Sequence, residues 1–95
     1  MKTPSFEDYN IPQHTQGAIT RYLEQGYMPG GFLTAVLGND LVRAVGGADH
    51  MNQACLVDIV KWVYNNMPLA ARGNESEMMH WCLKVRDELA EQDKA

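Results

Sequence analysis

The sequence predicts an all-α fold, with one compact four-helix domain at residues 13–92 and an extended arm at residues 1–12. Three observations support this prediction. Apolar residues recur at helical spacing in four segments, and glycine or proline separates those segments. No segment alternates polar and apolar residues as a half-buried strand does. A chain of 95 residues is long enough for a single domain with its own core.

Composition and charge exclude several functional classes. No apolar run approaches the roughly 20 residues that span a membrane, and the first residues have no apolar core of the signal-peptide type. The net charge of −4 and the scattered cations argue against nucleic-acid binding. Cys55 and Cys82 form no C-x-x-C pair, so we expect two reduced thiols in a cytosolic protein.

The arm contains prolines that oppose helix formation. Its apolar side chains are expected to anchor it, either on the body of the same chain or on a neighbouring subunit. These side chains are Phe6, Tyr9 and Ile11.

The first predicted helix, at residues 13–25, has one apolar face and ends at Gly26. The last predicted helix begins after Asn74, which forms a capping box with Glu77, and it continues to about Glu91. Its expected buried stripe consists of Met78, Trp81, Cys82, Val85 and Leu89.

The second predicted helix begins at Gly30 or Gly31, after Pro29, and continues to Val45. The third, at residues 48–66, is apolar around roughly two-thirds of its circumference, which is typical of a central helix. A chain of this size has little other protein to cover such a helix. We therefore expect a homo-oligomer with part of helix 48–66 in the subunit interface.

The Pro29-Gly30-Gly31 segment is the first candidate binding element. Glycines permit close approach, and free backbone N–H groups at a helix start attract anions, so a phosphate or carboxylate could bind at Gly30 and Gly31. The structural alternative is a tight turn that requires unusual backbone angles. No lysine follows, so this is not a nucleoside-triphosphate phosphate loop. Tyr27 precedes the turn and could stack on a base or ring.

Polar pairs interrupt two of the predicted helices. Asp40, beside Asn39, requires a partner, which could be Arg43 one turn later, a neighbouring helix or a ligand. Asn52 lies on the apolar side of its helix, one turn after Asp49. We predict that the two pairs form one polar network beside the glycine turn and fix the second helix against the third. A ligand pocket at the same place is the alternative.

Arg72 precedes the last helix and could bind a phosphate or remain solvated. The three histidines lie on separate elements and match no zinc-binding spacing, so no metal or cofactor is expected. The chain offers no nucleophile paired with a base, so we assign no catalytic residue and expect a protein that is not an enzyme. A helix-turn-helix interpretation is disfavoured, because the second helix is apolar and carries Asp49 and Asp58 but only Lys61 to contact DNA.

The run PGGFLTAVLGNDLVRAVGGAD at residues 29–49, followed by Asn52, Pro68 and Trp81, resembles small accessory proteins encoded by tailed phages and prophages of proteobacteria. These carry a similar PGGFL…AVL.NDL…AD..N core, and the resemblance covers residues 11–82. It implies a phage accessory protein in the host bacterial cytoplasm. By analogy, such proteins often counteract host defence.

Two binding functions and one catalytic function follow as hypotheses. The first is capture of a small anionic ligand, such as a cyclic nucleotide immune signal, at Tyr27, the glycine turn and the polar residues named above. The alternative is direct inhibition of a host defence protein, for example a CRISPR effector, by an acidic helical surface. An enzyme acting on nucleotides is the third hypothesis and has the weakest support in the residues.

Overall fold

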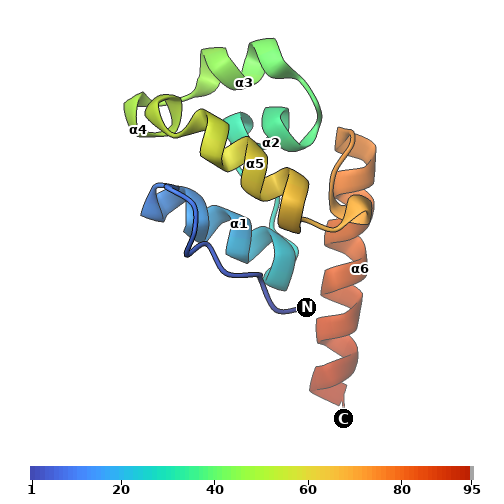
Figure 1. Ribbon diagram of the computed structural model, residues 1–95. Coiled ribbons are helices and arrows are strands. Elements are labelled where there is room, and N and C mark those ends of the chain that lie inside the picture. The colour runs from blue at the N-terminus through green and yellow to red at the C-terminus, as the bar shows by residue number, and fades with distance from the viewer. Residues whose placement is uncertain (95) are drawn as a thin grey trace.

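The computed structural model describes residues 1–94, and within that range the chain forms helices joined by short segments, without a β-strand (Figure 1). The elements are α1 (Gln13–Gln25), α2 (Gly31–Leu37), α3 (Leu41–Gly47), α4 (His50–Ala54), α5 (Leu56–Asn66), the 3₁₀ turn η1 (Leu69–Ala71) and α6 (Glu75–Lys94). The prediction of an all-α fold is confirmed. The prediction of four helices is wrong, because residues 1–94 contain six α-helices.

The predicted helix from Gly30 or Gly31 to Val45 is broken after α2. Asn39 adopts a left-handed conformation, with φ of +65°. Its N–H bonds to Val36 O at 3.3 Å, and the Asp40 N–H bonds to Ala35 O at 2.8 Å. This pair of bonds is the Schellman arrangement that ends a helix. The Asp40 side chain then accepts a hydrogen bond from the Arg43 N–H and begins α3.

The predicted helix at residues 48–66 is also divided, into α4 and α5. The Cys55 N–H lies 3.2 Å from both Met51 O and Asn52 O, which tightens the last turn of α4. The Ile59 N–H then bonds to Cys55 O at 3.0 Å, so α5 starts at once in a new direction. Cys55 is half-buried, Cys82 is buried, and both are free thiols.

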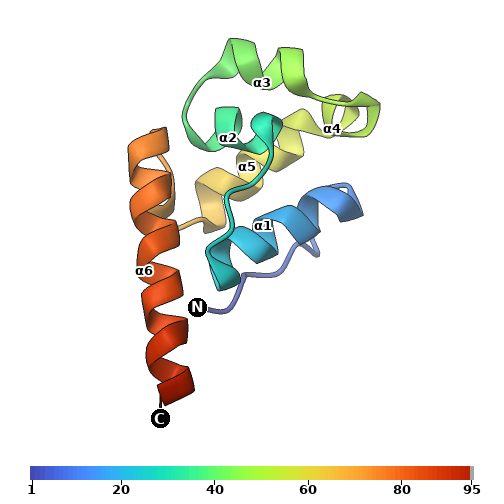
Figure 2. The ribbon, with the colours of Figure 1, turned by 180° about the vertical axis from the view of Figure 1, so that it is seen from behind.

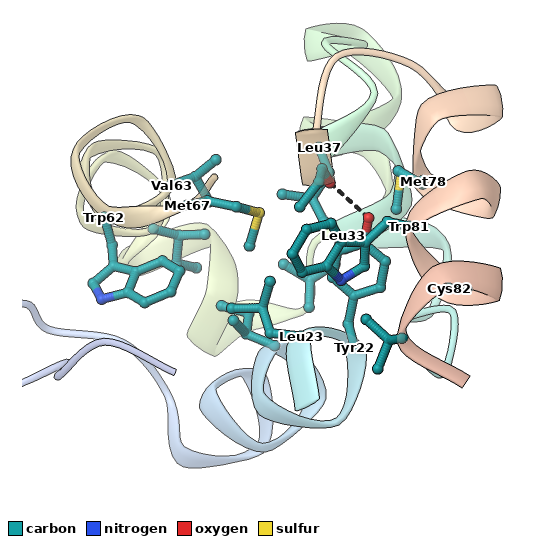
Figure 3. Packing of buried hydrophobic residues seen from close by; sticks show 14 of the residues in the cluster. Tyr22, Leu23, Leu33, Leu37, Trp62, Val63, Met67, Met78, Trp81 and Cys82 are labelled. Carbon is teal, nitrogen blue, oxygen red and sulfur yellow. Dashed lines mark hydrogen bonds between the residues drawn. The ribbon is translucent and has the colours of Figure 1, made fainter. Parts of the chain in front are cut away.

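The core lies where α1, α2, α5 and α6 meet (Figure 3). Tyr22 and Leu23 of α1 are fully buried against Trp62 of α5 and Met78 of α6. The Tyr22 hydroxyl donates to Ala71 O at 2.6 Å, the dashed line in Figure 3, and so ties α1 to η1. Burial raises the pKa of Tyr22 well above its ordinary value, since the phenolate would be poorly solvated there.

The arm is ordered along the body of its own chain. Phe6 stacks on Trp62 with ring centroids 4.6 Å apart, and Trp62 Nε1 donates to Ser5 O at 2.9 Å. Ile11 is buried, and the Tyr9 hydroxyl accepts hydrogen bonds from the side-chain amides of Asn65 and Asn66 at the end of α5. The prediction that these three apolar residues anchor the arm is confirmed for docking on the same chain.

The last helix agrees well with its sequence pattern. Asn74 Oδ1 accepts from the Glu77 N–H at 2.8 Å, which confirms the predicted cap. The predicted stripe is buried except for Leu89, which is exposed. The C-terminal half of α6 extends past the other helices in both views (Figure 1, Figure 2). No helix of residues 1–94 has the length and apolar character that crossing a membrane requires.

One side of α5 is covered and the other is open. Ile59, Trp62 and Val63 are buried, whereas Val57, Val60 and Tyr64 are exposed. The single chain therefore leaves part of the predicted central helix uncovered, as its apolar circumference indicated. The homo-oligomer that this exposure suggests stays a prediction.

Candidate functional site

Two adjoining cavities open beside the start of α2. The first has a volume of about 300 Å³ and is bounded by α1, α2 and the start of α4. The second, of about 500 Å³, lies between the start of α2 and the end of α3. Gly31, Phe32 and Gly47 border both cavities. We call the two together the glycine cleft; the other residues that matter to its chemistry are His14, Thr15, Gly30, Arg43, Gly46, Asp49 and Asn52.

The fold does not require the glycines of this cleft. A Cβ added at Gly30, Gly31 or Gly46 would have no atom within 4 Å, and one at Gly47 would make only ordinary contacts, with Phe32 at 3.7 Å. Within residues 1–94 positive φ angles occur only at Gly26, Asn39 and Gly73. The structural alternative of a turn with unusual backbone angles is therefore wrong. The glycines instead leave bare backbone facing open space, as a site for close approach of another molecule does.

The deep wall of the cleft is polar. Asn52 is only 6% exposed, and its Oδ1 accepts a hydrogen bond from the hydroxyl of Thr15, which is itself buried. Within residues 1–94 no hydrogen bond occupies Asn52 Nδ2, although Asn52 lines the cavity. The Nδ2 amide therefore remains available to an acceptor that enters the cleft.

Asp49 organises the mouth of the cleft. Its Oδ1 accepts the Asn52 N–H at 2.8 Å and caps α4, and its Oδ2 lies 2.9 Å from His14 Nε2. The Asn52 N–H and then His14 hold the pKa of Asp49 below its usual range. Both carboxylate oxygens are thus occupied by donors of the protein. This contact joins His14 of α1 to the start of α4, and the His14 side chain is half-exposed at the rim of the cleft.

Arg43 supplies the permanent positive charge of the cleft. It borders the second cavity with a largely exposed side chain, and its Nε lies 3.9 Å from Asp40 Oδ2. An exposed pair at that distance is weak, so the guanidinium is free to turn toward a ligand. α2 has only seven residues, so side chains rather than a helix dipole supply the charge here.

The structure brings together only half of the predicted site. Gly30, Gly31, Arg43 and Asn52 line the glycine cleft. Tyr27 does not line it; the Arg86 guanidinium lies 5.5 Å from the centroid of its ring.

Asn39, Asp40 and Arg72 also lie outside the cleft. Asn39 and Arg72 border a separate cavity of about 140 Å³, where the Arg72 guanidinium lies 5.9 Å from the Tyr64 ring centroid. Asn39 and Asp40 end one helix and start the next, so the Asn39-Asp40 pair has a structural role.

The predicted polar network is correct in part. Asp49 and Asn52 lie beside the glycine turn, as expected, but Asn39 and Asp40 do not join them. The partners are His14 and Thr15, so the network connects α1 to α4 rather than the second predicted helix to the third.

Sequence reasoning missed several residues that border the cleft, among them His14, Thr15, Phe32, Gly46 and Gly47. His14 and Thr15 lie 35 and 37 residues from their partners along the chain, and no local pattern indicates that pairing. Among residues 1–94 there is no group of three or more His, Cys, Asp or Glu side chains that could hold a metal ion.

Comparison of the chain with protein-family models, with curated proteins and with solved structures finds no match in any of the three.

Proposed function

We propose that this protein is a non-enzymatic binding protein that captures a small, acceptor-rich anionic ligand in the glycine cleft. The observation that carries this proposal is the set of glycines that neither backbone conformation nor packing requires. They surround a cavity whose polar wall presents an unoccupied amide donor on Asn52. Natural ligand pockets have volumes of roughly 300–1,000 Å³, and the two cavities lie within that range.

The side chains favour a ligand rich in acceptors. Asn52 Nδ2 and Arg43 are donors, and His14 becomes a second cation when it is protonated. The Asp49 carboxylate would repel an anion at the mouth of the cleft, although its two oxygens are directed toward the Asn52 N–H and His14, from which they accept hydrogen bonds. Phe32, on the border of both cavities, offers an aromatic surface to a ring. A nucleotide, with phosphate oxygens and a planar base, has this combination of features.

The chemistry of the cleft supports capture rather than turnover. Thr15 is the hydroxyl in the polar wall, and it is buried with its proton donated to Asn52. The ring of His14 faces Asp49 and not that hydroxyl, so the cleft lacks a nucleophile held by a base. Together with the resemblance of residues 29–49 to phage accessory proteins, this supports a counter-defence protein of the host bacterial cytoplasm that sequesters a cyclic nucleotide signal.

Titration calorimetry tests the proposal. The full chain is titrated with a panel of cyclic dinucleotides, cyclic trinucleotides and cyclic ADP-ribose species, and at least one is expected to bind. Gly31→Leu adds a side chain at a residue that borders both cavities and where the added Cβ has no atom within 4 Å. Binding is expected to fall more than about tenfold while the melting temperature is unchanged or higher, because leucine has the better helix propensity.

A matched control adds the same side chain at a distant exposed position. Ala90→Leu on α6 should leave binding unchanged. Ligand recovered intact after the complex is denatured indicates capture, whereas a cleaved product indicates an enzyme. No heat with any compound, for a protein shown to be folded, refutes the proposal, as does wild-type affinity in Gly31→Leu.

A second function, direct inhibition of a host defence protein such as a CRISPR effector, is favoured by the surface of α6. The half of this helix that extends past the body carries Asp87, Glu88, Glu91 and Asp93. Such a cluster could cover a basic groove on a nucleic-acid-binding enzyme. Retention of a stoichiometric host protein that is lost when Glu88 and Glu91 are changed to lysine would support this function over ligand capture.

A further inference from the structure

The molecule has a second feature that the glycine cleft does not use. Apolar side chains gather on the outer sides of α3 and α5, and all of them are between 43% and 82% exposed. We call this surface the apolar face; its residues are Leu41, Val42 and Val45 of α3 and Val57, Val60 and Tyr64 of α5. We propose that the apolar face binds a second copy of this chain to form a two-fold symmetric dimer.

A shared groove joins the two helices of the apolar face. Leu41 and Val60 border the same groove of about 100 Å³ between α3 and α5, whose floor includes Ala35 of α2. Val57, Val60 and Tyr64 follow one another at helical spacing along α5, and Leu41 and Val45 do so along α3. In Figure 1 α3 lies above α5, with α2 between and behind them, and in Figure 2, seen from the other side, α2 lies in front.

The size of the face matches what a dimer needs. At about 100 Å² for each partly exposed side chain, six residues present on the order of 600 Å² of apolar surface. A stable interface buries about 800 Å² per partner, of which roughly 60–65% is apolar. The apolar face therefore supplies the apolar part of a standard interface and is as large as the largest patch on a typical monomer.

Charge and shape favour a second copy over a charged partner. Residues 27–73 contain Arg43, Lys61 and Arg72 and also Asp40, Asp49 and Asp58, so this segment is neutral and the net charge of −4 arises elsewhere. Two copies can approach through a neutral surface without net repulsion. The face also combines a groove with the exposed ridge of α5, so a two-fold axis would place the ridge of each copy in the groove of the other.

The dimer and the ligand site are independent of each other. On α3, Leu41 borders the groove beside α5, whereas Arg43 borders the glycine cleft, because residues two positions apart lie on nearly opposite sides of a helix. Failure of one proposal therefore leaves the other testable by a different measurement.

Sedimentation velocity over about 1–500 µM tests the dimer, and the wild type is expected to reach twice the monomer mass of 10.7 kDa. Val57→Asp and Val57→Lys should each weaken dimerisation at least about 100-fold, since a two-fold interface carries every substitution twice. Both signs of charge should act alike, because the cost is burial of a charge. Leu41→Asp provides an independent change on α3.

Leu83→Asp on α6 is the matched control, since Leu83 is also an exposed leucine but lies outside the face. It should leave the dimer intact, and circular dichroism should show helical spectra for every variant. A wild-type protein that stays monomeric throughout the concentration range overturns the proposal. The apolar face would then be a surface for binding a different protein. A dimer that survives all three charged substitutions in the apolar face overturns it as well.

Discussion

The break between α2 and α3 determines whether substitutions at Asn39 and Asp40 raise or lower the free energy of unfolding. Asn39 has φ of +65° and Asp40 caps α3 with an oxygen 3.3 Å from the Arg43 N–H. A residue other than glycine, asparagine or aspartate in the left-handed region costs about 1–2 kcal/mol. Asn39→Ala should therefore lower the free energy of unfolding by about 1 kcal/mol, and Asn39→Gly should leave it equal or raise it by about 0.5 kcal/mol.

Asp40→Ala should also destabilise the protein. Loss of a helix N-cap costs about 0.5–2 kcal/mol, and the length of this bond places the expected loss near 0.5–1 kcal/mol. A continuous helix through residues 31–45 would reverse all these signs. Alanine at either position would then raise the free energy of unfolding by about 0.5 kcal/mol, and glycine at position 39 would lower it by a similar amount.

Urea unfolding followed by circular dichroism at 222 nm measures these differences. The protein concentration must be the same in every experiment, because a dimer makes stability depend on concentration. The free energy of unfolding of a small domain is about 5–15 kcal/mol, so a change of about 1 kcal/mol is readily resolved. If both alanine variants are more stable than the wild type and Asn39→Gly is less stable, the described break between α2 and α3 is refuted.

Three further predictions concern other contacts. Gly26→Ala should cost at least about 2 kcal/mol, measured by urea unfolding, because φ is +73° and the new Cβ would lie 2.7 Å from Cys82 O; unchanged stability would contradict that close contact. Tyr22→Phe should cost about 1–3 kcal/mol by the same measurement, since it leaves the buried Ala71 carbonyl without its donor. The lowered pKa of Asp49 means that its contribution to stability is present above its unfolded value of about 3.9 and is lost as the pH falls through the folded value. Stability curves from pH 7 to about pH 2 should therefore fall less steeply for Asp49→Asn than for the wild type, and parallel curves would contradict the assignment.

Local patterns predicted much of the fold. Helix α1 has the predicted boundaries, Gly26 ends it, and Asn74 caps α6. These features depend on neighbours within one or two turns, so the sequence contains their causes. The break at Asn39 also had a local signal, because Gly-Asn followed by Asp and an apolar residue is typical of a helix end and a new cap. The apolar periodicity on both sides concealed that signal.

The candidate site was predicted less completely. Four of the predicted residues line the cleft: Gly30, Gly31, Arg43 and Asn52. The Pro29-Gly30-Gly31 segment itself indicated the two glycines. Asp40 was misjudged because a carboxylate in an apolar run has the same pattern whether it caps a helix or faces a ligand. The bend at Cys55 could not be foreseen, since no glycine or proline marks it.

By itself, the sequence determined the helical class, the bounds of α1, the start of α6, the anchors of the arm and the excess of apolar surface on residues 48–66. Each of these follows from residue type and spacing along one segment. Only the tertiary structure decided that the glycines of positions 30, 31 and 46 face open space, that Thr15 and His14 reach Asn52 and Asp49, and that α3 extends the apolar surface of α5. The physical reason is that these relations join residues distant in the chain, and their geometry is set by how whole helices pack.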